Sequence, residues 1–166
     1  MNNFDEFKKY ITGNPSKNTT LIINGKKKNI KGMVGLTTKN YPESEYIKIV
    51  FNDRSFLLIM INDKEIYYAD KIIDRIHEIS DNVIGKVDAI KYNGKEYKLG
   101  NRDDYQYVIQ RYVGTPNDVE GEARFSDYFP ISGPKEYLSL GWLSETGERA
   151  DINCKIIDVK EIVLPE

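Results

Sequence analysis

The sequence predicts a mainly β fold, either a sandwich or a partly open barrel of about ten strands, with a short N-terminal helix. Polar and apolar residues alternate with a period of two over many short stretches, as in strands with one face in water. Two Asn-Gly pairs, which supply the positive φ angles of tight hairpins, lie between such stretches. Because no helical runs alternate with the strands, a parallel α/β sheet is disfavoured.

The chain has the length of a single domain. With 166 residues it can bury roughly 70% of its unfolded surface without disulfides or metals. We divide it into an N-terminal helix over residues 1–16 and one β-rich domain over 17–166. The alternative is two divergent β modules, 17–82 and 83–166. It rests on the likeness of "NGKKKNIKG" (24–32) to "NGKEYKLGN" (93–101), and of residues 45–62 to 136–153.

The first half begins with the helix and continues with strands. Phe4, Phe7 and Ile11 follow helical spacing, and Asn3 can cap the helix start. Residues 19–36 form a predicted hairpin that turns at the first Asn-Gly pair, and 45–70 contain three further strands. The run "FLLIMI" is apolar at every position, which predicts a central strand covered on both faces.

The segment "DKIIDRIHEISD" is compatible with two structures. Its four isoleucines, Ile72, Ile73, Ile76 and Ile79, fall on one helical face, and Asp70 can cap that helix. Isoleucine also favours strands because it is β-branched. We favour a short helix and keep the strand as the alternative.

The second half reads as strands throughout. A hairpin turns at Asn93-Gly94, a separate tyrosine-rich strand follows at 103–113, and further strands lie at 119–129, 135–144 and 151–164. In the last of these the alternation changes between Ile156 and Ile157. That change predicts either a bulge or two strands placed end to end.

Composition excludes several kinds of site and gives no sign of a cofactor. The net charge of −2 gives no general reason to expect a nucleic acid or an anionic membrane as partner. The single cysteine, Cys154, excludes a disulfide framework, and the single histidine, His77, excludes a site with two imidazoles. The N-terminus does not resemble a secretory signal, and the longest apolar run is too short to cross a bilayer. We expect a cytoplasmic protein that is not an enzyme, and the oligomeric state stays open.

Asp127 interrupts the clearest strand pattern in the chain. Val119, Gly121, Ala123 and Phe125 occupy one face, and Asp127 continues this apolar series. Three explanations are open: the strand ends or bulges at Ser126; the carboxylate is buried and satisfied by Arg111, Arg124 or backbone N–H groups; or it lines a pocket with Tyr128 and Trp142. Because an unpaired buried carboxylate costs several kcal/mol or becomes protonated, we favour the first two. Asp127 then marks where the strand stops alternating.

Two other clusters could support function. The carboxylates within residues 118–127 could serve a hydrolase, since paired carboxylates perform glycoside hydrolysis. Glu120 and Glu122 share one strand face, however, so a solvated surface explains them more simply. The lysine-rich hairpin at 26–31 could bind a nucleic acid, but it has few interleaved aromatic residues, and we expect no such partner.

Tyrosine is the unusual feature of the composition, with 12 tyrosines against 6 phenylalanines. Tyrosine and tryptophan are enriched at contact surfaces. We therefore predict a binding or accessory module that recognises a protein partner or a small ligand through a tyrosine-rich face. Its contributors are Tyr105, Tyr107, Tyr112, Asp127, Tyr128 and Trp142. The alternative is that these aromatic residues complete the core.

The C-terminal half resembles an uncharacterised prokaryotic family, domain of unknown function 4178. The likeness lies in the Asn93-Gly94-Lys95-x-Tyr97 hairpin, the Glu120-Gly121-Glu122 strand leading to Asp127-Tyr128, and Leu138-Ser139 at the next strand. It covers about half of the chain. The resemblance implies a β-rich cytoplasmic domain of unknown function and identifies no catalytic residue.

Overall fold

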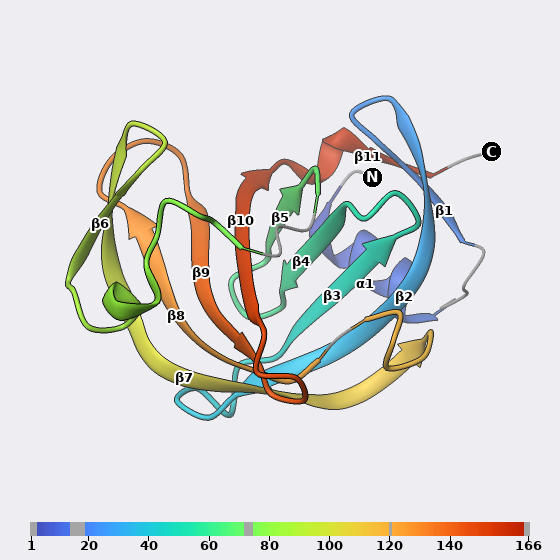
Figure 1. Cartoon of the computed structure of the whole chain (residues 1–166). Coiled ribbons are helices and arrows are strands. Elements are labelled where there is room, and N and C mark those ends of the chain that lie inside the picture. Colours follow the sequence, from blue (N-terminus) through green and yellow to red (C-terminus); the bar gives the residue numbers. More distant parts are fainter. Residues whose placement is uncertain (1–2, 14–18, 72–74, 120, 165–166) are drawn as a thin grey trace.

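The computed structural model describes residues 3–13, 19–71, 75–119 and 121–164, and it shows a mainly β protein with one α-helix in that part of the chain (Figure 1). The helix is α1 (Phe4–Gly13). The strands are β1 (Thr20–Ile23), β2 (Lys26–Thr38), β3 (Tyr46–Phe51), β4 (Phe56–Met60), β5 (Glu65–Ala69), β6 (Ala89–Tyr92), β7 (Lys95–Val113), β8 (Ala123–Pro130), β9 (Glu136–Leu143), β10 (Arg149–Ile157) and β11 (Ile162–Val163). The predicted β-rich class and N-terminal helix are confirmed.

Eight of the strands close into a barrel. The antiparallel sheet has the order β11-β1-β2-β3-β4-β5-β10-β9-β8-β7-β6, and an additional pairing of β2 with β7 closes the eight strands between them, these two included, into a ring. Both joining strands are long. The first residues of β2 pair with β1 and its last with β7, while β7 pairs first with β6 and later with β2. The barrel is therefore closed by long strands that each exchange one partner for another, where the sequence predicted at most a partly open barrel.

The two halves of the chain repeat one order of strands. Each half has a hairpin followed by three further antiparallel strands, β1 to β5 and then β6 to β10. The Asn-Gly turns of the two hairpins have equivalent positions and positive φ angles, 51° and 79° at Asn24-Gly25 and 54° and 76° at Asn93-Gly94. The likeness of 24–32 to 93–101 thus coincides with equivalent hairpins. That of 45–62 to 136–153 does not, because it matches β3 and β4 with β9 and β10. The halves join in one sheet at β5–β10 and β2–β7.

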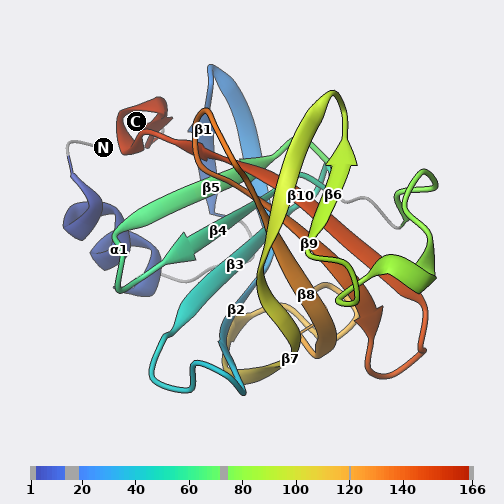
Figure 2. The same cartoon turned by 90° about the vertical axis from the view of Figure 1, so that its left-hand side faces the viewer.

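Apolar residues fill three clusters, one inside the barrel and two outside it. The inner cluster includes Val34, Val50 and Leu58. One outer cluster lies between the barrel wall and α1, and the other lies beneath the 75–88 segment. Figure 2 shows α1 and this segment on opposite sides of the barrel. Because α1 covers the outer face of β4, both faces of this strand are buried, which confirms the prediction for "FLLIMI".

The helix expected over 70–81 is wrong for the residues that can be described. Residues 70–71 and 75–80 form neither helix nor strand, and a short 3-10 helix, η1 (Asp81–Val83), follows with Ser80 as its N-cap. Ile76 and Ile79 are buried against the barrel wall, whereas Ile72 and Ile73 lie outside the described residues. The backbone N–H of Ile76 donates to the Asp151 carboxylate at 2.7 Å, so contact with the barrel replaces helical hydrogen bonds.

Two further predictions of strand boundaries need correction or completion. The 95–100 and 103–113 strands are one strand, β7, whose register shifts between Leu99 and Asp104, where Asp103 has a φ of 51°. Bulges of this kind bend a strand without ending it. At the other end of the chain, β10 and β11 are two strands separated by the 3-10 helix η2 (Val159–Glu161), as one of the two alternatives predicted.

At Gly141 the backbones of β8 and β9 come close to each other. A Cβ at this position would lie 2.1 Å from the Arg124 carbonyl oxygen and 2.7 Å from the Phe125 Cα, both backbone atoms of β8. Because backbone atoms in a closed barrel have little freedom to move, we expect Gly141→Ala to lower the free energy of unfolding by at least about 2 kcal/mol. Urea denaturation measures this. The matched control is Gly13→Ala, where a Cβ meets nothing within 4 Å. Equal stability of the two variants would contradict the close approach.

Candidate functional site

The barrel contains a cavity of about 430 Å³ near one of its ends. Such a volume is typical of small-molecule sites. Its wall consists of inward-facing residues from seven of the eight barrel strands, among them Thr38, Tyr46, Lys48, Leu58, Met60, Asn101, Gln106, Phe125, Asp127, Phe129, Tyr137, Ser139 and Ile152. Its exposed rim comes from Tyr41 and Glu45 in the β2–β3 loop and from Asn62 and Asp63 in the β4–β5 turn.

Strand alternation explains why these residues meet. On β8, the inward positions are Phe125, Asp127 and Phe129. Asp127 pairs across the strands with Ser139 of β9, so the two side chains point to the same side of the sheet. The alternate positions of β8 that are mostly apolar in the sequence therefore point into the barrel. Asp127 is a carboxyl group at one of these inward positions.

Asp127 does not mark the end of the alternation, as the sequence suggested. β8 continues without a bulge from Ala123 to Pro130. Neither candidate arginine neutralises the carboxylate: Arg124 binds Asp103 at 2.5 and 2.9 Å on the outer surface, and Arg111 donates to the Val119 carbonyl at 3.1 Å. The pocket explanation is the one that fits, although its predicted neighbours lie on the opposite face of the sheet.

Burial raises the pKa of the Asp127 carboxyl to about 7. The hydrogen bond from Ser139 works against this rise, the nearby carboxylate of Asp104 adds to it, and the hydrogen bond from Asn101 again opposes it. Asp127 is thus half-buried, faces the cavity and changes its charge near neutral pH.

A network behind the cavity wall fixes Asn101. Its Nδ2 donates to Asp104 Oδ2 at 2.8 Å, and its Oδ1 accepts from Asn40 Nδ2, also at 2.8 Å. The backbone N–H groups of Asn40 and Tyr105 donate to Asp104 Oδ1 at 2.9 and 2.7 Å. Asp104 is fully buried, and these donors satisfy it. The network holds the Asn101 amide in a fixed orientation toward Asp127.

Aromatic side chains and one further polar pair complete the cavity. The Tyr46 hydroxyl donates to Gln106 Oε1, and Gln106 Nε2 donates to the Gly121 carbonyl at 2.8 Å. Burial raises the pKa of Tyr46, and the charges of Asp127 and Asp104 raise it further. The Tyr137 ring makes an edge contact with Phe129 at a centroid distance of 4.9 Å. The cavity is therefore mainly aromatic and aliphatic with a small polar region, as in many ligand sites.

Two further groups of chemical interest, an ammonium and a thiol, lie near the cavity. The ammonium group of Lys48 lies over the Phe56 ring, 5.1 Å from its centroid. Cys154 is fully buried in the inner cluster, and burial raises the pKa of its thiol well above the usual range. A high thiol pKa means little thiolate, so Cys154 behaves as an apolar side chain.

The residues of the predicted tyrosine-rich face do not lie together in the structure. Tyr105 and Tyr107 lie beside each other on the outside of β7, with ring centroids 5.7 Å apart. Tyr112 packs against the outer cluster beneath α1. Tyr128 is fully buried beneath the 75–88 segment, where its hydroxyl donates to the Val87 carbonyl at 2.9 Å, and Trp142 packs against the same cluster. The structure places only Asp127 of the six residues in the cavity.

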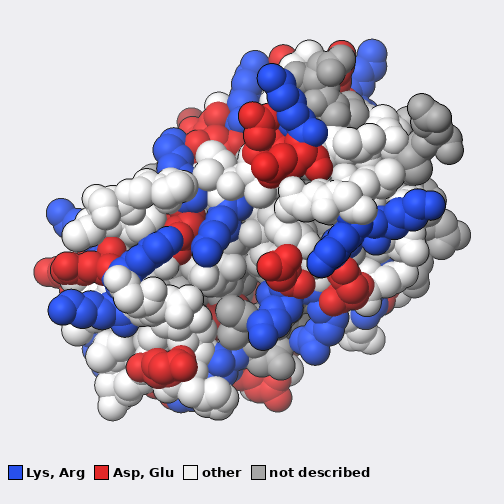
Figure 3. Space-filling view, turned by 90° about the horizontal axis from the view of Figure 1, so that it is seen from above, with Lys and Arg blue, Asp and Glu red and all other residues white. Residues whose placement is uncertain are grey.

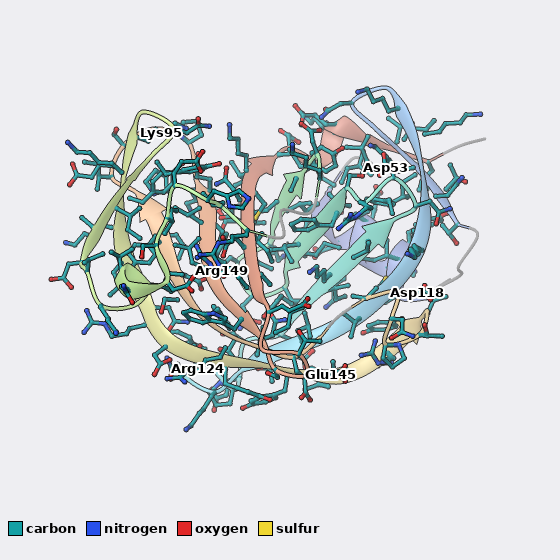
Figure 4. All side chains as sticks on the ribbon, viewed as in Figure 1. Asp53, Lys95, Asp118, Arg124, Glu145 and Arg149 are labelled. Carbon is teal, nitrogen blue, oxygen red and sulfur yellow. The ribbon has the colours of Figure 1, made fainter. Side chains whose placement is uncertain are left out.

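The other carboxylates of 118–127 do not converge on the cavity. Asp118 closes a turn by accepting from the backbone N–H of Thr115 at 2.9 Å. Glu122 is exposed and accepts from the Tyr105 hydroxyl at 3.2 Å, and Glu120 lies outside the described residues. In Figure 4, Asp118 and Arg124 lie at opposite sides of the barrel. The 118–127 segment is therefore not one acidic site.

The lysine hairpin and the remaining surface show mixed charge. Lys28 is buried, pairs with Asp53 and lies 5.7 Å from the Tyr68 ring centroid, whereas Lys26 and Lys27 are exposed. Basic and acidic side chains alternate over the face shown in Figure 3.

Among the described residues no group of three or more His, Cys, Asp and Glu side chains could hold a metal ion. None of the described helices is long and apolar enough to span a membrane.

Comparison with known proteins adds no further identification. No protein-family model matches the sequence, no curated protein matches it, and no solved structure matches the fold. The resemblance of the C-terminal half to domain of unknown function 4178 stays a prediction. The functional argument consequently depends on the cavity itself.

The sequence contained part of this site. It identified Asp127 as exceptional, but Tyr46, Asn101, Gln106 and Ser139 received no prediction. A signal for Ser139 existed, because it is a polar residue among the alternating residues of β9. For Asn101 the bulged register of β7 removed any readable periodicity.

The raised pKa of Asp127 predicts a particular dependence of stability on pH. An unfolded aspartate titrates near 3.9, so between about pH 4 and pH 7 the folded protein holds a proton that the unfolded chain has released. The contribution of Asp127 to the free energy of unfolding is fully present at low pH, and it is lost as the pH rises through about 7. Relative to Asp127→Asn, we expect the wild-type free energy of unfolding to fall by up to about 4 kcal/mol from pH 4 to pH 8. Urea denaturation of both proteins across this range measures the difference. Parallel pH profiles would contradict the placement of Asp127.

Proposed function

We propose that the protein binds a small molecule inside the barrel, with Asp127 as the polar anchor. The observation that carries this proposal is the position of a titratable carboxyl in the wall of a cavity of about 430 Å³. Eight-stranded barrels have an interior that side chains can just fill or that can hold one small ligand. In this barrel one part of the interior is filled by the inner cluster, and the other part is the cavity.

The distribution of polar groups supports binding more than packing. A barrel interior built for stability alone is best filled with apolar side chains, because buried polar groups must be desolvated. This interior places Asp127, Ser139, Asn101 and Tyr46 around one cavity and supports them with a second layer that includes Asp104. Binding sites have such an arrangement, in which a few polar groups orient a ligand and apolar walls supply contact area.

The arrangement favours binding over hydrolysis. The hydrolase hypothesis used the carboxylates of 118–127, and Asp118 and Glu122 lie outside the cavity wall. Recognition of a protein partner through Tyr105 and Tyr107 stays a prediction that concerns the outside of β7. It is independent of the cavity and compatible with a ligand inside it.

Occupation of the cavity is testable with an uncharged apolar dye, N-phenyl-1-naphthylamine, whose fluorescence rises in apolar surroundings. We expect saturable binding at about one dye per chain. Met60→Trp should weaken dye binding at least tenfold, because Met60 lines the cavity and a larger side chain fills it. Fluorescence titration of the wild type and the variant measures this effect.

The matched control is Ile131→Trp, which adds the same side chain outside the barrel. Ile131 is 61% exposed and is not part of the cavity wall. It should leave dye affinity unchanged. Absence of saturable dye binding, or equal weakening by the two variants, would count against the barrel interior as the binding site.

A further inference from the structure

We infer that the cavity selects an organic cation, a protonated amine with an apolar or aromatic body, and that Asp127 binds its ammonium group. This inference rests on the proposed function and defines the chemical class of the ligand. Three independent features of the cavity support it: the use of its hydrogen-bond donors, its balance of charges and its aromatic walls.

Near Asp127, the hydrogen-bonding groups that remain available to a ligand are acceptors and not donors. Ser139 and Asn101 lie opposite Asp127 on the neighbouring strands and lower its pKa through their polar side chains, and Asn101 Nδ2 donates to Asp104 Oδ2 at 2.8 Å. Tyr46 donates its hydroxyl hydrogen to Gln106. A carboxylate accepts about four hydrogen bonds and the hydroxyl oxygens keep lone pairs, so unused acceptors remain on Asp127, Ser139 and Tyr46. A ligand group that donates several hydrogens fits them, and an ammonium group donates up to three.

The charges around the cavity also favour a cation. Asp127 lies in the wall and Glu45 and Asp63 lie at the rim, whereas the basic residue among the described lining residues is Lys48. The Lys48 ammonium lies against the Phe56 ring. The charge that acts on Asp127 is the carboxylate of Asp104, which makes ionisation of Asp127 less favourable. A cationic ligand would compensate this negative charge.

Aromatic rings line the cavity on the strands around Asp127. Tyr46, Phe125, Phe129 and Tyr137 belong to β3, β8 and β9, and Tyr41 lies at the rim. The faces of aromatic rings attract cations, and groups of such rings recognise alkylammonium ligands in other proteins. The same rings provide contact area for an apolar body. Carboxylate and rings together therefore match an amine better than a fatty acid or a neutral sugar.

Binding of an amine should depend on pH because the anchor must be ionised. The ionisable groups that face Asp127 or share its cavity are Asp104 from β7, Tyr46 and Lys48 from β3, Tyr137 from β9 and Cys154 from β10, with Glu45 and Asp63 at the rim. Burial raises the pKa of Tyr46, Tyr137 and Cys154, which keeps these groups neutral below pH 8. Asp127, with a pKa of about 7, therefore changes from mostly ionised at pH 8 to mostly protonated at pH 6.

Three probes with the same ring and chain but different charge test the inference. Tryptamine, tryptophol and indole-3-propionate carry the same ring and the same two-carbon chain, ending in an ammonium, a hydroxyl and a carboxylate. Their affinities are measured by displacement of N-phenyl-1-naphthylamine and by calorimetry. At pH 8 we expect tryptamine to bind at least about tenfold more tightly than either analogue. Its affinity should fall about tenfold at pH 6, in proportion to the ionised fraction of Asp127.

Variants connect this preference to Asp127. Asp127→Asn keeps the shape of the side chain and removes its charge and one acceptor oxygen, so the preference for tryptamine and its pH dependence should both disappear. Asp88→Asn is the control, since Asp88 is exposed and pairs with Arg102 at 2.9 Å away from the cavity. Melting curves by circular dichroism verify folding. If Asp127→Asn does not fold, the order of the three wild-type affinities at pH 8 decides.

The outcomes separate the two proposals. Dye binding together with equal or tighter binding of indole-3-propionate or tryptophol would overturn the amine inference and retain a ligand cavity. Dye that no probe displaces, or an affinity for tryptamine that does not change between pH 8 and pH 6, would also overturn it. Failure of the dye and all three probes to bind would overturn the proposed function itself.

Discussion

Main-chain hydrogen bonds between β2 and β7 turn an open sheet into a barrel, and the other features of the site depend on this closure. Without this pairing, residues 33–38 of β2 and 106–113 of β7 would be unpaired edges, and the inward-facing residues would line an open concave surface. With it, Asp127 and Lys48 face one enclosed interior from opposite halves of the chain. Enclosure is also the reason why ionisation of Asp127 is expensive.

Closure involves equivalent parts of the two halves. Each half begins with a hairpin that turns at an Asn-Gly pair, and the second strand of each hairpin is one of the two strands that close the barrel. The halves differ in what covers them. α1 packs on the outer wall of the first half, whereas the 75–88 segment packs on the outer wall of the second. The cavity lies where both halves contribute to the interior, so it is a property of the whole barrel.

A half-buried carboxyl that faces the cavity has an energetic cost, and the proposed ligand would account for it. Asp104 is satisfied by Asn40, Asn101 and its neighbour's backbone, so its burial is compensated. Asp127 receives hydrogen bonds from Ser139 and Asn101, yet its pKa stays raised, which means that these bonds do not offset its desolvation. A ligand that donates to Asp127 or carries a positive charge would supply the missing compensation.

Local sequence patterns predicted most of the elements but not their closure. The Asn-Gly turns, the Phe4-Phe7-Ile11 helix face and the apolar β4 are local signals, and all three are present in the structure. The β2–β7 pairing joins residues far apart in the sequence, and bulges shift its register, so no periodicity reveals it. The same limit explains the misplaced expectation for Asp127: alternation correctly assigned its face, but whether that face meets packed side chains or a cavity depends on the closed barrel. Tyr128 was expected on a binding face, but it is buried. The 75–88 segment, which is distant in sequence, covers the outward face of β8 where Tyr128 lies.

The claim that the barrel interior is the binding site is tested most directly by methionine methyl NMR. The chain has three methionines: Met60 lines the cavity, Met33 is buried in the outer cluster beneath α1, and Met1 supplies the third signal. Saturation with N-phenyl-1-naphthylamine should shift the Met60 methyl resonance strongly and show dye contacts to it, while the Met33 resonance stays in place. A shift confined to Met33, or an unchanged Met60 resonance at saturating dye, would contradict a ligand site inside the barrel.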